Sequence, residues 1–332
     1  MKEIIEFLSS DTNFNEDYIL LNGNKEKIDT TNFRIIEDTK NDLGVNFLFL
    51  DGGNAEIAKT PAFSIQFIRV VGVYLCNDKN SSGRKQKTLF ASEFYSIIKL
   101  SYESSGKKYK IKNLPIKGKE ILPKEFIVDG LESPSAVGDF IRRLSEISMS
   151  SHILEEMEED DILIIDGTLE ASSKMEAEML LDLHYSTIKK GVMLCSVAKT
   201  TTMTTAKGNS VIACLNKLAP TDKWFYPIKK DVPTIFFAKL HPKSNYIFKI
   251  ETNKSEEKLN ENLFINLAKI SKDPIFLGYP FGMVEVDRIA RVSKREAEIL
   301  RIELSAKVGD FWKFIEKEEK SLDAHNVLDS IS

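Results

Sequence analysis

Val45-Asn46-Phe47-Leu48-Phe49-Leu50-Asp51-Gly52-Gly53 is the clearest strand signal in this chain of 332 residues. An apolar, aromatic run that ends in a carboxylate and two glycines predicts a strand buried on both faces, with Asp51 at its carboxyl end. The pattern recurs as Asp161-Ile162-Leu163-Ile164-Ile165-Asp166-Gly167-Thr168. Asp-Gly is also a common way to leave a strand, so one occurrence would be ambiguous. Two occurrences, each after a fully apolar run, favour a shared site.

The composition is that of a soluble globular protein, with 42% hydrophobic residues, 29% charged residues and a net charge of -4. No apolar run approaches the length of a membrane span, and Met1–Glu6 is unlike a secretory signal. The cysteines are widely spaced and lie mostly in apolar runs, which predicts reduced core residues: Cys76, Cys195 and Cys214. We therefore expect a cytoplasmic protein without a membrane segment or a zinc centre.

Basic residues gather in three places: Lys79 to Lys87, Lys107 to Lys119, and Lys239 with His241 and Lys243. Each cluster is more typical of a solvated loop than of a phosphate-binding track. The net charge neither indicates nor excludes a nucleic-acid partner.

The first third predicts a sheet. Residues 1–45 read as a short helix followed by polar, turn-rich sequence. Phe63–Leu75 and Lys87–Tyr102 are expected to be the next two strands of a meander, joined by a turn over 77–83. Residues 103–133 are basic and contain proline, and we expect an exposed loop or flap.

The middle of the chain predicts a helix, strand, helix and strand. Apolar residues recur at helical spacing from Ser135 to Glu159, and Ser133 or Ser135 can cap that helix. After the Asp166 strand, a helix over 174–190 and a strand over 191–197 favour a parallel crossover. The second of these strands ends near Lys199, which is followed by hydroxyl side chains.

The last third of the chain contains both strand patterns and helix patterns. Residues 232–240 and 245–251 predict paired strands, and a helix follows over 259–270. A break at 277–282 precedes one long helix from 284 past 304, and the tail after Gly309 is expected to be helical. We predict one compact domain over 46–305, an N-terminal segment over 1–45 and a C-terminal tail over 306–332.

Four carboxylates form a plausible set of hard ligands: Asp51, Glu146, Asp166 and Asp287. Mg²⁺ and Mn²⁺ prefer such oxygens, and two ions can activate water and stabilise the leaving oxygen of a phosphodiester. Lys199, at a neighbouring strand end, can neutralise phosphate charge in the transition state. Two of these residues have simpler interpretations, because Glu146 can pair with Arg142 one turn away and Asp287 can be a solvated helix residue.

Further segments share a recognisable order and spacing. They are Phe49-Leu50-Asp51-Gly52-Gly53-Asn54-Ala55-Glu56, Arg142 to Glu146 ahead of Leu163-Ile164-Ile165-Asp166-Gly167-Thr168-Leu169, Val197-Ala198-Lys199-Thr200, Ala238-Lys239-Leu240-His241-Pro242, and Leu277-Gly278-Tyr279-Pro280 followed by Glu285-Val286-Asp287-Arg288-Ile289-Ala290. From Asp51 to about Leu304 the chain thus resembles the NurA family of DNA-end-processing nucleases, which work with the HerA hexameric translocase.

The resemblance implies an α/β fold with a ribonuclease-H-like mixed sheet flanked by helices, with insertions. It also implies a homodimer and a Mn²⁺- or Mg²⁺-dependent deoxyribonuclease that resects DNA ends in double-strand break repair with a HerA-like ATPase. Carried over by motif, the acidic site is Asp51, Glu146, Asp166 and Asp287, and Lys199 completes the catalytic set. The DNA-binding residues implied are Arg142, Lys239, His241 and Tyr279.

Some alternatives stay open on the sequence. Some family members have histidine in place of Asp287, so that residue could be a ligand or an acid–base group. Glu132 or Glu56 could compete with Glu146. The chain could also be a catalytically silent DNA-binding regulator of the translocase, and the site chemistry does not distinguish DNA from RNA.

Overall fold

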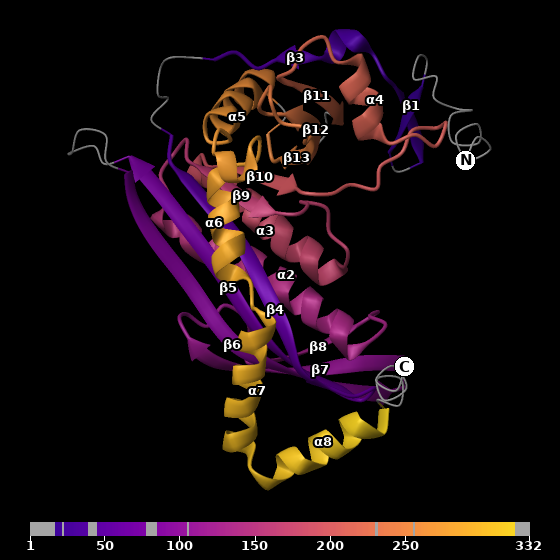
Figure 1. The fold of residues 1–332 in the computed structure, drawn as a ribbon, viewed down its shortest axis with the longest axis vertical. Coiled ribbons are helices and arrows are strands. Elements are labelled where there is room, and N and C mark those ends of the chain that lie inside the picture. The colour runs from indigo at the N-terminus through magenta and orange to yellow at the C-terminus, as the bar shows by residue number, and fades with distance from the viewer. Residues whose placement is uncertain are drawn as a thin grey trace. The chain divides into compact units, whose positions relative to one another are not determined.

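A computed structural model describes residues 17–21, 23–38, 45–77, 85–104, 106–229, 232–254 and 256–322. Most of the turn expected over 77–83 lies outside these residues. The short helix expected at the N-terminus would begin within residues 1–16, which also lie outside them. Figure 1 traces the elements along the chain.

The predicted fold class, an α/β fold with a mixed sheet flanked by helices, is confirmed (Figure 1). In the described parts of the chain, the hydrogen-bonded strand order is β3-β11-β12-β13-β10-β9-β4-β5-β6-β7-β8, beside a separate β1-β2 pair. β9 and β10 run parallel, while β6, β7 and β8 are antiparallel neighbours, as are β10, β13, β12 and β11. The strands are β1 (Tyr18–Leu21), β2 (Asn24–Lys27), β3 (Arg34–Ile35), β4 (Phe47–Lys59), β5 (Phe63–Asn77), β6 (Lys85–Glu103), β7 (Gly106–Lys117), β8 (Glu125–Asp129), β9 (Ile162–Asp166), β10 (Met193–Ala198), β11 (Trp224–Lys229), β12 (Thr234–Lys239) and β13 (Phe248–Thr252).

The helices follow local signals. Ser133 and Ser173 accept hydrogen bonds as N-caps, and Gly191 ends a helix in the left-handed conformation that glycine favours. The α-helices are α2 (Pro134–Ile153), α3 (Lys174–Lys190), α4 (Val211–Leu218), α5 (Glu257–Lys269), α6 (Phe281–Ala290), α7 (Lys294–Val308) and α8 (Asp310–Leu322). None of the helices in the described residues is long and apolar enough to cross a membrane.

The chain divides into two compact units. The first unit contains residues 1–49, 75–86 and 158–284, and the second contains 50–74, 87–157 and 285–332. The domain boundaries expected from the sequence, at 45 and 305, stay a prediction.

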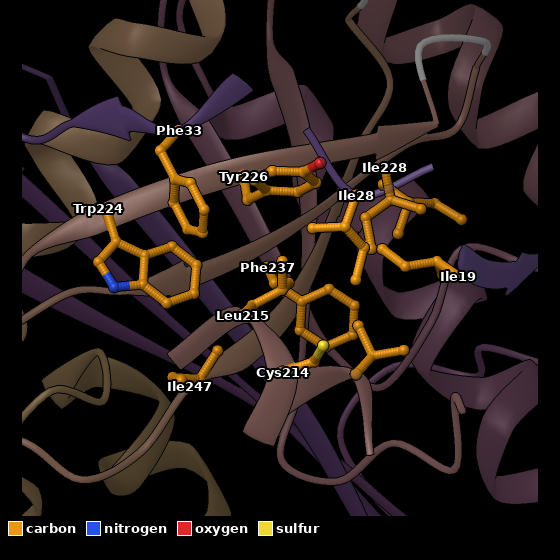
Figure 2. Packing of buried hydrophobic residues seen from close by; sticks show 12 residues of the cluster. Ile19, Ile28, Phe33, Cys214, Leu215, Trp224, Tyr226, Ile228, Phe237 and Ile247 are labelled. Carbon is orange, nitrogen blue, oxygen red and sulfur yellow. The ribbon is translucent and has the colours of Figure 1, made fainter. Parts of the chain in front are cut away.

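A cluster of buried aliphatic and aromatic residues forms one hydrophobic core in the first unit (Figure 2). Trp224 and Tyr226 of β11 meet Phe33 edge-on, with ring centroids 5.0 and 4.8 Å apart. Ile19 of β1 and Ile28 also join this core. The segment that we expected to be polar and rich in turns therefore supplies strands and core residues.

A second core lies in the second unit. Trp312 and Ile315 of α8 are buried against Ile57 of β4 and Phe67 of β5. The guanidinium of Arg301 lies over the Trp312 ring, 5.1 Å from its centroid. This packing explains why α8 forms, since it buries the apolar face of a charged helix.

Several expectations are wrong. Residues 103–133 form strands β7 and β8 instead of a loop, because Tyr109 and Ile111 alternate with exposed lysines along β7. The long helix expected after residue 284 is two helices, and Ser293 caps the second. α4 and β11 were not expected.

The largest correction concerns β4. The strand continues through Gly52 and Gly53 to Lys59, so Asp51 lies in the middle of a strand and not at its end. Asp166 does end its strand, as predicted.

Candidate active site

Asp51 is a buried carboxylate within β4, with 4% of the residue exposed. Its Oδ1 accepts a hydrogen bond from the backbone N–H of Gly52, 2.8 Å away. A buried carboxylate requires hydrogen bonds or a counter-charge, and the Gly52 N–H supplies one such hydrogen bond.

Gly52 leaves room for Glu146. A Cβ atom at Gly52 would lie 2.8 Å from Glu146 Oε1, which is closer than real Cβ contacts allow. Glu146 lies on α2 and is 2% exposed. Two of the predicted carboxylates are therefore close in the second unit: Glu146 packs against Gly52, the residue directly after Asp51.

Two arginines hold Glu146. Arg142 forms an ion pair with Glu146 Oε1, and Arg143 Nη1 lies 3.4 Å from Oε2. Arg142 Nη1 also lies 3.4 Å from the carbonyl oxygen of Gly52. Glu146 therefore forms the ion pair one turn along the helix that the sequence offered as its simpler interpretation. Its partner in that pair is Arg142, which the family resemblance implied to be a DNA-binding residue.

Helix α6 runs along the other face of β4. A Cβ at Gly282 would collide with the Phe49 ring, and one at Gly53 would collide with the carbonyl group of Ala290. Asp51, halfway between Phe49 and Gly53, shares their face because strand side chains alternate.

Asp287 lies on α6, in the second unit with Asp51. Its Oδ2 pairs with Arg291 Nη2 at 2.7 Å, and the Arg291 side chain is largely exposed. This ion pair joins residues one turn apart on the helix, and the Asp287 side chain is partly exposed.

Asp166 and Lys199 meet at the carboxyl ends of two parallel strands in the first unit. Asp166 ends β9 and pairs in register with Val197 of β10, and Lys199 follows β10 directly. Lys199 Nζ lies 3.5 Å from Asp166 Oδ1. The carboxyl ends of parallel strands are the usual place for ligand-binding residues in open α/β sheets.

Glu251 anchors the loop that follows Asp166, and sequence reasoning missed it. Its carboxylate accepts hydrogen bonds from Thr168 Oγ1, at 2.9 Å to each oxygen, and from the backbone N–H of Leu169. Lys249 Nζ lies 2.6 Å from Glu251 and 3.2 Å from Glu170. Burial opposes the charge on Lys249, but Glu251 and Glu170 together raise its pKa above the usual value. The available signal was the alternation of Lys249 and Glu251 with Phe248 and Ile250 along the strand.

The other predicted DNA-binding residues also lie in the first unit. Lys239, at the end of β12, is largely buried, with Nζ 3.6 Å from Asp222 Oδ1. The Tyr279 ring is buried between Phe276 and Phe248, with centroids 4.9 and 5.0 Å away. The structure therefore gives Tyr279 a packing contact.

The two alternatives to Glu146 have different surroundings. Glu56 Oε1 accepts hydrogen bonds from Ser64 Oγ at 2.9 Å, Gln66 Nε2 at 3.1 Å and Ser135 Oγ at 2.6 Å. It thus ties β4 to the start of α2. Glu132 is exposed.

Carboxylates are the donors that Mg²⁺ and Mn²⁺ prefer. In the described residues, no three histidine, cysteine, aspartate or glutamate side chains gather so that they could hold a metal ion. Glu146 and Asp287 are instead bound by arginines. The convergence of the four predicted carboxylates on one ion stays a prediction.

No family model matches the chain, and no curated protein matches it. Among solved structures it is similar to the NurA nuclease from Sulfolobus solfataricus, with 14% identity, 94% of this chain and 95% of that chain covered, and a TM-score of 0.49. It is similar to endonuclease V from Ciona intestinalis in complex with inosine-containing DNA, with 12% identity, 87% and 97% covered, and a TM-score of 0.36. The third is Argonaute from Aquifex aeolicus, with 11% identity, 76% and 29% covered, and a TM-score of 0.29.

Proposed function

We propose that this chain is a divalent-metal-dependent deoxyribonuclease. The observation that supports this best is the burial of Asp51 in β4 beside a glycine that makes room for the Glu146 carboxylate. Buried carboxylates on neighbouring elements are typical of functional sites.

Several side chains have roles that do not involve the metal. Lys199 can bind a phosphate oxygen and offset its charge, and Asp166 keeps that ammonium group at the strand ends. Glu251 and Lys249 fix the loop behind Asp166. The proposed ligands of Mn²⁺ or Mg²⁺ are those predicted from sequence: Asp51, Glu146, Asp166 and Asp287.

The finer proposal rests on the sequence motifs alone. It is a cytoplasmic homodimer that resects DNA ends as an exonuclease, and could cut single strands internally, in double-strand break repair with a HerA-like ATPase. Light scattering tests the dimer, and co-elution with a purified HerA-like ATPase tests the partnership.

The deciding experiment is digestion of end-labelled single- and double-stranded DNA by the purified full chain with Mn²⁺, Mg²⁺ or EDTA. Cleavage should require the metal, and Asp51→Asn and Asp166→Asn should each lower the rate by at least about 10²-fold. Asp182→Asn, at an exposed position of α3, is the matched control and should cleave like wild type. Equal cleavage by Asp51→Asn and wild type would refute the assignment. Cleavage of RNA strands of the same sequence tests whether the enzyme distinguishes DNA from RNA.

The pairing of Glu146 with Arg142 and Arg143 favours a second candidate, a catalytically silent DNA-binding regulator of the translocase. A regulator would bind DNA equally in EDTA and in Mn²⁺ and would leave the labelled strands intact. The nuclease would shorten them.

A further inference from the structure

Three lysines lie near the ring of His241 in the first unit, and two of them pair with one exposed carboxylate. Lys223 precedes β11, His241 and Lys243 lie in the loop between β12 and β13, and Lys272 follows α5. The carboxylate is Asp38, beyond β3. These side chains come from four segments, so no local sequence pattern reveals the cluster.

Asp38 bridges two of the lysines. Its Oδ1 lies 2.9 Å from Lys223 Nζ and 3.6 Å from Lys272 Nζ. The Lys223 side chain is only 14% exposed, whereas that of Asp38 is 73% exposed. The largely buried Lys223 side chain therefore pairs with an exposed carboxylate, and an ion pair with such an exposed partner contributes little stability.

His241 adds a hydrogen-bond donor to the cluster. The backbone N–H of Lys243 lies 3.2 Å from Nδ1 and donates to it, so the neutral ring carries its proton on Nε2. Burial and then the charges of Lys272, Lys243 and Lys223 lower the pKa of His241, and Asp38 only partly opposes them. The three lysines therefore outweigh the single carboxylate around this ring.

We propose that Lys223, Lys272, Lys243 and His241 bind a backbone phosphate of single-stranded DNA, and that Asp38 occupies the phosphate position until DNA arrives. Ammonium groups and a neutral imidazole N–H all donate to phosphate oxygens, and the excess positive charge attracts the anion. His241 is among the DNA-binding residues that the family resemblance implies, whereas the three lysines and Asp38 are not. Lys239 is not part of this cluster, because its ammonium group pairs with Asp222.

DNA as the source of the phosphate rests on the proposed function. The phosphate-binding cluster itself does not. Binding is therefore measured in EDTA, by fluorescence anisotropy of a labelled single-stranded oligonucleotide, so that cleavage plays no part. If the protein proves to have no nuclease activity, the proposed enzymatic function is refuted, but the binding measured in EDTA still tests the phosphate-binding cluster.

Asp38→Asn should bind the oligonucleotide about 2- to 5-fold tighter, because it removes a competing exposed charge worth up to about 1 kcal/mol. Lys272→Ala should bind more weakly and lower the slope of log affinity against log salt by about 0.7, the value for one phosphate contact on a single strand. Lys258→Ala, an exposed lysine of α5, is the control and should do neither. If Asp38→Asn fails to tighten binding and Lys272→Ala behaves like Lys258→Ala, the proposal is overturned.

The titration of His241, followed by NMR, reports on the cluster directly. Its signal is assigned by its loss in His241→Gln. Addition of the oligonucleotide should raise the pKa of His241, because a nearby anion stabilises the imidazolium form. Inorganic phosphate serves as the second probe. A shift with inorganic phosphate but not with the oligonucleotide would overturn DNA as the occupant, and a shift with neither would overturn the site.

Discussion

Replacing Glu251 by alanine should destabilise the first unit more than any other single loss of charge around Asp166. The carboxylate is almost fully buried and binds three groups, Lys249, Thr168 and the backbone of Leu169. Removing it leaves a largely buried ammonium group without its nearest counter-ion. It also detaches the loop behind Asp166.

The loss of stability can be estimated from the contacts that Lys249 keeps in the variant. Removal of one partner of a buried ion pair costs about 3–5 kcal/mol. Lys249 keeps Glu170 at 3.2 Å, so we expect the lower end, about 3 kcal/mol. Glu170→Ala is the matched control: this carboxylate is much more exposed, and its loss should cost about 1 kcal/mol or less.

Urea unfolding can report on the first unit alone. The chain has two tryptophans, and in a Trp312→Phe background the remaining indole is Trp224, in the core of that unit. With an m-value of about 2–3 kcal/mol/M, the Glu251→Ala midpoint should fall by about 1–1.5 M. The double variant Lys249→Met/Glu251→Leu should recover part of the loss, since no buried charge is left unpaired. A Glu251→Ala midpoint equal to that of Glu170→Ala would refute the reasoning.

Three further predictions concern other parts of the chain. Gly53→Ala should cost about 1–3 kcal/mol or more, because its methyl group meets the carbonyl of Ala290, and calorimetry should show a lower Tm. The hydrogen bond from Arg69 lowers the pKa of Glu296, so this carboxylate stabilises the fold above its unfolded value of 4.5 and loses that effect as the pH falls through its folded pKa. Urea midpoints of wild type should therefore fall more steeply in acid than those of Glu296→Gln; parallel curves would contradict this. Burial and the charge of Glu251 raise the pKa of the Cys195 thiol, so iodoacetamide at pH 8 should label it only after unfolding, as mass spectrometry of its peptide would show.

Elements with strong local signals could be predicted from the sequence. α2 and α3 have regular apolar spacing and serine caps, and β9 is an apolar run that ends at Asp166. The approach of Lys199 to Asp166 also follows from local reasoning, since the two residues lie at the ends of strands joined by a crossover.

The remainder depended on distant partners. β2 is fully exposed, and β3 forms only because its backbone pairs with β11, nearly two hundred residues later. Gly52 and Gly53 read as a turn because the sequence does not show that Glu146 and Ala290 press against them. Glu251 was missed for the same reason: the loop that it holds is 82 residues away.

The pairing at the start of β4 also sets an order of events during synthesis. The backbone carbonyl of Asn46 accepts from Ile162, and the Asn46 amide donates to Asp161, across 115 residues. Until the ribosome has released that later segment, one side of β4 presents an apolar edge with unsatisfied backbone groups. Contacts this distant in sequence form slowly. A nascent chain that stalls before residue 158 would therefore be prone to aggregation and a natural client for chaperones.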